Sequence, residues 1–150
     1  MSADLKHADQ WVFDLDNTLY PAECDLFAQI DVRMTQFVSQ ALKLPEDEAR
    51  RLQKQYYAEH GTTLNGMMQI HGVDPAPYLD FVHDIDLTPI PELLDLRDAV
   101  RDLPGRKYIF TNGSKKHADR VVTKLGLDGL FDGYFGIEDA GYEPKPRRSA

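Results

Sequence analysis

The chain has 150 residues, of which 42% are hydrophobic and 28% charged, so it can form one ordinary domain with a sizeable core. Its formal net charge of −8 and the absence of a Lys/Arg run argue against nucleic acid polymers and anionic membranes as partners, whereas a small anionic substrate is compatible with a locally positive site. The polar N-terminal stretch argues against a signal peptide, and no run approaches the ~20 apolar residues of a membrane span.

The first predicted element is a strand from Gln10 to Leu15, which overlaps the stretch WVFDLDNTLY. Bulky apolar residues lead into Asp14 and Asp16, which stand one position apart. Alternation along a strand would put both carboxylates on one face, where they repel each other and lose hydration. A pair with this cost indicates a functional site.

A long helical tract follows. Apolar residues recur at helical spacing from Leu26 to Leu42, which predicts the first helix. Pro45 opens a second helix, whose acidic first turn suits the helix dipole, and Gly61 ends it. Gly72 closes a third, short helix, and Asp74 caps a fourth that has proline at its first position. The tract therefore predicts a helical unit apart from any sheet.

Helices and strands alternate in the remainder of the chain. A helix over Leu93–Leu103 leads into a strand over Arg106–Thr111; Ser114 caps another helix, and a weaker strand spans Gly133–Ile137. Short apolar strands that alternate with helices predict a parallel α/β sheet. Such sheets bind ligands at the carboxyl ends of their strands, where both acids and Thr111 lie.

The residues at these strand ends suit phosphoryl transfer. Asp14 and Asp16 can hold Mg²⁺ through oxygen, and one can act as nucleophile while the other acts as acid or base. Thr111 begins the sequence TNGS, in which a hydroxyl, a flexible glycine and a helix N-terminus form a cradle for an anion. Lys145, between two prolines in EPKP, can balance the charge of the carboxylates and the anion. Together these features indicate a reaction through an aspartyl-phosphate.

Each feature alone also has a purely structural interpretation. An Asp-x-Asp pair can cap a loop, Thr-Asn-Gly can form a turn, and Lys145 can be a solvated lysine, so the functional hypothesis depends on their order and their places at strand ends. The single cysteine, Cys24, excludes an internal disulfide, favours a reducing cytoplasm and is interpreted as a half-buried helix residue rather than a nucleophile. The histidines show no metal-ligand spacing and are interpreted as surface or helix residues: His7, His60, His71, His83 and His117.

Three motifs in this order resemble those of the haloacid-dehalogenase-like hydrolases: FDLDNTLY the first, IFTNGS the second and EPKP the third. The insert between the first two is similar to the cap of that family, and YYAEHGTTLNG and FVHDIDL resemble its pyrimidine 5′-nucleotidase branch. The resemblance implies an α/β fold with a Rossmann-like parallel sheet, incomplete at about three strands. Residues 1–20 and 89–150 would form the phosphatase core, and residues 21–88 a helical cap inserted after the first strand.

The resemblance also implies a role for each residue that matches a motif. Asp14 would attack phosphorus, and Asp16 would protonate the leaving oxygen and later activate water. Both would ligate Mg²⁺, Asp16 through its backbone carbonyl, and Lys145 would neutralise Asp14 and the phosphoryl group. The phosphoryl oxygens would be bound by the second motif: Thr111, Asn112 and Gly113. Because a halide leaves without a proton whereas an alkoxide needs one, Asp16 favours a phosphatase over a dehalogenase.

The chain departs from the family pattern after Lys145, because it ends five residues later in KPRRSA. Members of the family continue with two more strands and an acidic motif that completes the Mg²⁺ site. We therefore expect a truncated or frameshifted product with weakened Mg²⁺ binding that is close to inactive. Without those strands, Trp11 to Leu15 would form an apolar sheet edge, and we expect poor solubility or self-association through it.

Other hypotheses stay open beside Mg²⁺-dependent hydrolysis of a pyrimidine nucleoside monophosphate, or of a small sugar phosphate or phosphoglycolate. A signalling receiver domain shares the acidic pair, Thr and Lys, but it lacks a helical insert of this size and carries its phosphorylated Asp on a separate strand. A non-catalytic remnant or binding module of the same fold is the other alternative. In the cap, five side chains could stack on a base or form the core of a helical bundle: Tyr56, Tyr57, Met67, Met68 and Phe81.

Overall fold

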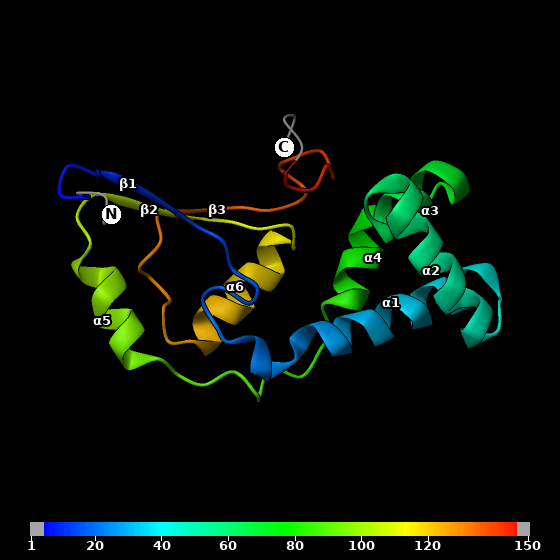
Figure 1. Ribbon diagram of the computed structural model, residues 1–150, viewed down its shortest axis with the longest axis horizontal. Helices are drawn as coiled ribbons and strands as arrows, with labels where there is room; N and C mark the ends of the chain where they lie inside the picture. The colour runs from blue at the N-terminus through cyan, green and yellow to red at the C-terminus, as the bar shows by residue number, and fades with distance from the viewer. Residues whose placement is uncertain (1–4, 147–150) are drawn as a thin grey trace. The chain divides into compact units, whose positions relative to one another are not determined.

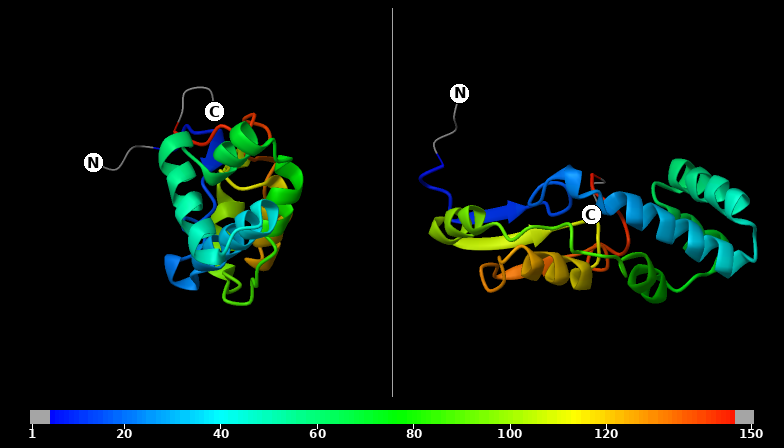
Figure 2. Two further views of the ribbon diagram at one scale, coloured as in Figure 1. Left: turned by 90° about the vertical axis from the view of Figure 1, so that its right-hand side faces the viewer. Right: turned by 90° about the horizontal axis from the view of Figure 1, so that it is seen from below.

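The computed structural model describes residues 5–146, and this part of the chain divides into two compact units. Residues 5–24 and Leu87–Asp139 form the sheet unit, and Asp25–Asp86 with residues 140–146 form the helical unit. Figure 1 shows the strands and helices of each unit, and Figure 2 shows them from two further directions. Each unit has buried apolar side chains of its own.

The sheet unit contains a three-stranded parallel sheet in the order β1 (Gln10–Phe13), β2 (Arg106–Phe110), β3 (Gly133–Phe135). In its register, Ile109 in the middle strand lies between Phe13 and Tyr134. The three-stranded parallel α/β sheet that the sequence predicts is therefore confirmed.

Each strand ends one or two residues before its predicted limit. β1 stops at Phe13 because the chain then turns: Asn17 has a φ of 58°, and the Thr18 amide donates to the Leu15 carbonyl at 3.1 Å. β2 stops at Phe110, one residue before Thr111. The predicted site residues of β1 and β2 thus lie just beyond the ladder rather than within it.

Helices α5 (Leu94–Asp102) and α6 (Lys115–Lys124) lie on one face of this sheet (Figures 1 and 2). The steps from β1 to β2 and from β2 to β3 run in the same direction across the sheet. Right-handed crossovers that run in one direction put their helices on the same face of the sheet.

Side chains of the sheet differ in exposure. Ile109 is fully buried, whereas Val12 and Phe135 are 65% and 42% exposed. Within residues 5–146, β1 has a strand neighbour on one side, and the self-association expected through this edge stays a prediction.

The helical unit contains α1 (Leu26–Leu42), α2 (Glu46–His60), α3 (Thr63–His71) and α4 (Pro75–Val82), and no strand lies between residues 21 and 88. Its core is a cluster of buried side chains from the first three helices: Val38, Ala49, Tyr56 and Met67. Helix α3 approaches α2 closely at Gly66, where a Cβ atom would lie 2.5 Å from the Cβ of Tyr56. A glycine at this position therefore lets the two helices pack.

The helix ends carry the cap residues that the sequence predicts. Gly61 and Gly72 follow α2 and α3 with φ values of 82° and 62°, a region that glycine adopts without steric cost. The Asp74 carboxylate accepts from the Ala76 amide at 3.1 Å at the start of α4. Pro45 is the N-cap of α2 and does not belong to its first turn.

A short 3₁₀ helix, η1 (Ala22–Cys24), follows the turn after β1. It leaves Ala22 and Glu23 exposed and turns Cys24 inward, so this cysteine is buried, with 9% of its surface exposed, rather than half-buried. No helix between residues 5 and 146 has both the length and the apolar character that a membrane span needs.

Candidate functional site

The turn after β1 presents the first predicted acid at the surface of the sheet unit. Asp14 is exposed, whereas Leu15 beside it is fully buried and anchors the turn. The amides of Thr18 and Leu19 both donate to the Leu15 carbonyl, at 3.1 and 3.0 Å. This turn brings the Thr18 hydroxyl back to Asp14, where it donates to Oδ2 at 2.7 Å. The Asp14 carboxylate is thus held by a neighbour four residues along the chain.

The second acid, Asp16, is half-buried, and two side chains contact one of its oxygens. The Tyr20 hydroxyl donates to Oδ1 at 2.7 Å, and His117 Nε2 lies 2.9 Å from the same atom. Burial, and then the charge of Asp16, raise the pKa of Tyr20, which keeps its hydroxyl protonated as a donor. The other oxygen, Oδ2, lies 3.5 Å from the Thr111 hydroxyl.

The loop from β2 to α6 contains the predicted anion cradle. The Gly113 amide donates to Thr111 Oγ1 at 3.0 Å, and the Ser114 hydroxyl caps α6 by accepting from the His117 amide at 3.1 Å. A Cβ atom on Gly113 would lie 3.1 Å from His117 Cδ2 and 3.4 Å from Thr111 Oγ1. The glycine therefore lets the backbone pass close to the site, at a helix N-terminus that favours an anion.

The turn after β3 holds the beginning of α6 in place. Lys115 Nζ lies 3.0 Å from Asp139 Oδ1, and the Gly136 amide donates to Asp139 Oδ2 at 3.0 Å. The Gly136 amide and Lys115 together hold the pKa of Asp139 below its ordinary value. The Lys115 amide donates to Glu138 at 2.9 Å. These two acids thus bind the start of α6 and the turn itself.

The residues that the sequence predicts as metal ligands are the two acids that follow β1. In the part of the chain that the structure describes, no three His, Cys, Asp or Glu side chains cluster so that they could hold a metal. Asp14 and Asp16 nevertheless supply hard oxygen donors, which fit Mg²⁺ because this ion commonly keeps several waters and takes one or two carboxylates with a substrate phosphate.

Three of the residues predicted for the site lie in contact with one another in the structure. Asp14 lies two positions before Asp16, which is one of the three. Asp16, Thr111 and Gly113 are linked by the contacts above. Asn112 lies between them in the same loop and is exposed. Lys145 lies in a turn within residues 140–146, which belong to the helical unit, so its predicted role beside Asp14 stays a prediction.

His117 is a member of this site that the sequence interpretation missed. It lies on a helix as expected, but its side chain is fully buried against Asp16. The reason is that α6 begins directly after the cradle, so its first turn faces the strand ends. The Ser114 cap three residues earlier was the available signal, because it places His117 in that first turn. His83 is also buried, at 9% exposure.

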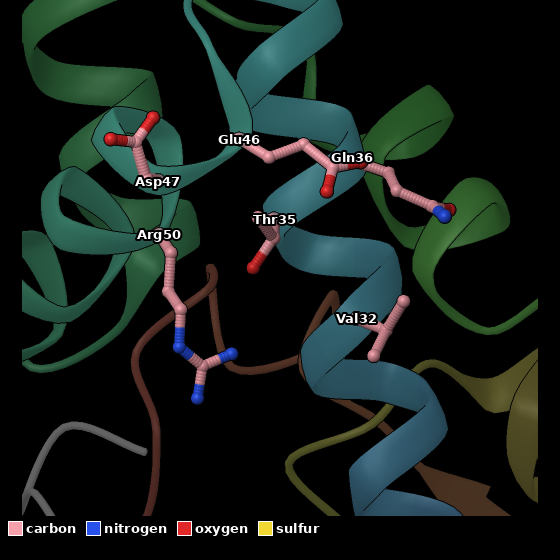
Figure 3. A pocket seen from close by; sticks show the side chains of 6 residues that line it. All are labelled: Val32, Thr35, Gln36, Glu46, Asp47 and Arg50. Carbon is pink, nitrogen blue, oxygen red and sulfur yellow. The ribbon is translucent and has the colours of Figure 1, made fainter.

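The helical unit has a depression of about 300 Å³ between α1 and α2 (Figure 3). It is lined by polar and charged side chains with one valine: Val32, Thr35, Gln36, Glu46, Asp47 and Arg50. Arg50 is already paired with Asp31 at 3.0 Å. None of the residues predicted for the site lines this depression.

Residues 11–150 match the haloacid dehalogenase-like hydrolases, and the chain belongs to this family. It is 32% identical over 133 residues to phosphate metabolism protein 8 of Saccharomyces cerevisiae, a match that covers 81% of this chain and 41% of the yeast protein. Its fold is similar to that of a HAD phosphatase from Thermococcus onnurineus, with a TM-score of 0.54, 19% identity, and coverage of 89% of this chain and 64% of that one.

Proposed function

We propose that this protein is a Mg²⁺-dependent phosphomonoester hydrolase that acts through an aspartyl-phosphate on Asp14. The observation that carries the proposal is the meeting of two strand ends: Asp16 after β1 lies 3.5 Å from the Thr111 hydroxyl after β2. A proton-transferring acid and an anion cradle are thus neighbours, and Asp14 stands two residues before that acid. Membership in a hydrolase family supports the same reading.

The reaction has two steps that use the same pair of acids. In the first, the Asp14 carboxylate attacks phosphorus, the ester P–O bond breaks, and the leaving oxygen takes a proton from Asp16. In the second, water attacks phosphorus and gives a proton to Asp16, and the bond between phosphorus and Asp14 breaks to release inorganic phosphate. Because Asp16 donates one proton and recovers one, the enzyme returns to its starting state.

The loop after β2 and Lys145 balance the charge around phosphorus. Thr111, Asn112 and Gly113 bind the phosphoryl oxygens at the N-terminus of α6, and Lys145 neutralises Asp14 and the phosphoryl group. Asp14 and Asp16 would hold Mg²⁺, whose charge would offset that of the phosphoryl oxygens.

The proposed substrate is a pyrimidine nucleoside 5′-monophosphate, with a small sugar phosphate or phosphoglycolate as the alternative. Tyr56 and Met67 belong to the core of the helical unit, which removes them from the side chains that could stack on a base. Tyr57 is 64% exposed and Met68 is half-buried, so both stay as candidates, whereas the Arg33 guanidinium already lies 3.8 Å from the centroid of the Phe81 ring. A comparison of kcat/KM for uridine 5′-monophosphate, glucose 6-phosphate and phosphoglycolate tests this choice.

The proposed partners are small phosphorylated metabolites. The proposed compartment is the cytoplasm. The net charge of −8 supports partners other than nucleic acid polymers and membranes, and the single Cys24 supports a reducing compartment.

The experiment that tests the function is hydrolysis of 4-nitrophenyl phosphate with and without Mg²⁺. In a full-length form of the protein, we expect Asp14→Asn to abolish turnover, because an amide is a poor nucleophile, and Asp16→Asn to leave a phosphoryl group on Asp14 that mass spectrometry detects. Full turnover by Asp14→Asn would exclude the covalent route. Failure of the wild-type chain to cleave the ester would favour the alternative, a non-catalytic remnant or binding module of the same fold.

A further inference from the structure

We propose that Glu138 is a positioning residue for the anion cradle, because it anchors the start of α6 from the turn after β3. The proposal rests on the proposed function, in which the loop from Thr111 to Gly113 binds the phosphoryl oxygens. It extends that function to a residue outside the three sequence motifs, which takes no part in the reaction itself.

The turn after β3 holds the cradle loop on both sides of Ser114, the N-cap of α6. On one side, the Ile137 amide donates to the Gly113 carbonyl at 2.9 Å. On the other side, the Lys115 amide donates to Glu138 Oε1 at 2.9 Å. Two consecutive residues of the turn thus fix the two neighbours of Ser114, and the loop cannot leave its place without breaking these bonds.

The turn is itself well fixed. The Gly136 amide donates to Asp139 Oδ2 at 3.0 Å, and the Asp139 amide donates to the Gly136 carbonyl at 3.1 Å. Asp139 Oδ1 also pairs with Lys115 Nζ at 3.0 Å. A Cβ atom on Gly136 would lie 2.6 Å from Glu138 Oε2 and 2.8 Å from the Lys115 amide nitrogen, so the glycine leaves the space in which the carboxylate reaches α6. Glu138 Oε2 is buried there, so the protein rather than solvent holds this side chain.

A fixed loop matters for an anion because several donors bind it strongly only when they converge. The cradle contains Gly113, and a glycine backbone has more accessible conformations than that of other residues. Without its anchors the loop would have to become ordered each time phosphate binds, and this entropy cost would weaken binding. With them, the donors are arranged before phosphate arrives.

The position and the charge of Glu138 act in opposite directions on a bound anion. As a negative charge near the cradle, Glu138 repels phosphate, so loss of the charge alone would strengthen binding. As an anchor it arranges the donors, so loss of the anchor weakens binding. The sign of the change in phosphate affinity therefore distinguishes a positioning residue from a carboxylate that competes with phosphate for the N-terminus of α6.

The test measures the dissociation constant of inorganic phosphate by NMR titration in the presence of Mg²⁺. We expect Glu138→Ala to weaken binding by about tenfold, the size of a lost hydrogen bond to a charged group, although a negative charge is removed. Glu138→Gln removes the charge but keeps an oxygen acceptor for the Lys115 amide, so it should bind phosphate at least as tightly as wild type. The control Asp128→Ala removes an exposed acid beyond the other end of α6 and should stay within about twofold of wild type.

A second readout follows the anchor itself and needs no ligand. Hydrogen exchange of the Lys115 amide should be at least about tenfold faster in Glu138→Ala than in wild type, because the amide loses its acceptor. Glu138→Gln should keep this amide protected. Exchange in wild type that is as fast as in Glu138→Ala would overturn the proposal.

Tighter or unchanged phosphate binding in Glu138→Ala would also overturn the proposal while the proposed function stands. The same holds for weaker binding in Glu138→Gln if its Lys115 amide stays protected. A wild-type chain that does not bind phosphate overturns the cradle of the proposed function instead, and hydrogen exchange then decides whether Glu138 anchors α6.

Discussion

Two carboxylates, one in each unit, collect several hydrogen-bond donors but differ in the kind of donor. Asp31 in the helical unit binds two cations, Lys54 Nζ at 2.5 Å and Arg50 at 3.0 Å, and also accepts from the Gln53 side-chain amide at 2.8 Å. Burial acts to raise the pKa of Asp31, but the two cations outweigh it and hold the pKa below its ordinary value. The partners of Asp16 described above are instead a phenol and an imidazole, with an alcohol nearby.

The difference shows how the surroundings of an acid determine its use. A carboxylate between an ammonium and a guanidinium group keeps its charge, because protonation would break both ion pairs, so Asp31 can only join helices α1 and α2. The proposed function gives Asp16 an acid–base role, whereas Asp31 joins α1 to α2, although both are partly buried acids with several partners.

The largest expected effect on activity is the loss of Asp16, with the loss of Asp31 as its comparison. We expect Asp16→Ala to lower kcat/KM for phenyl phosphate by about 10³-fold, the usual contribution of general acid–base catalysis. Asp31→Ala should leave that value within about twofold, because no catalytic step uses the residue. Steady-state kinetics on both variants checks the contrast. A large loss of activity in Asp31→Ala, in protein that is folded by circular dichroism, would contradict the division of roles.

The apolar core of the helical unit should give the next largest effect. Met67 is fully buried in the cluster with Val38, Ala49 and Tyr56, so Met67→Ala should lower the free energy of unfolding by about 3 kcal/mol. Ile70 lies on the same helix and is 52% exposed, and Ile70→Ala should cost less than about 1 kcal/mol. Urea denaturation of both variants measures the difference. Equal costs would mean that this cluster does not support the unit.

A helix cap should have a smaller effect of the same kind. The Asp74 carboxylate satisfies the Ala76 amide at the start of α4, and Asp74→Ala should cost about 1 kcal/mol of unfolding free energy. Asp74→Asn keeps a side-chain acceptor and should cost at most a few tenths of that amount. Urea denaturation measures the unfolding free energy of both variants. If Asp74→Asn lost as much unfolding free energy as Asp74→Ala, the effect would come from the charge of Asp74 rather than from the cap.

The caps also explain which parts of the fold the sequence could predict. Asp74 and Ala76 are two residues apart, and Gly72 directly follows the helix that it ends, so these signals are local and the limits of α3 and α4 are predicted closely. The sequence predicts that these segments are strands but not where they end. For β1, the end depends on the turn that follows, which requires a positive φ at Asn17.

The site divides in the same way. The positions of Asp14, Asp16 and Thr111 just beyond strand ends could be predicted, because each follows an apolar stretch within a recognisable motif. His117 was missed because its partner Asp16 is 101 residues away: the Ser114 cap places His117 in the first turn of α6 but does not identify that partner. The contact between His117 and Asp16 forms only when β1 pairs with β2 and α6 packs against the face of the sheet.

The smallest expected effect is the pH dependence that Asp31 gives to stability. Because its pKa is lower in the folded state, its stabilising contribution is fully present above the unfolded value of about 3.9 and is lost as the pH falls through the folded value. The pairs with Lys54 and Arg50 are partly exposed, so the contribution should be below about 1 kcal/mol. We therefore expect Asp31→Asn to be less stable than wild type at about pH 7, and the gap to narrow below about pH 4. The matched change Asp47→Asn, on an exposed acid in the first turn of α2, should give a smaller gap at about pH 7. Urea denaturation across this range measures both gaps, and one that stays constant for Asp31→Asn down to about pH 3 would show that its ion pairs do not stabilise the helical unit.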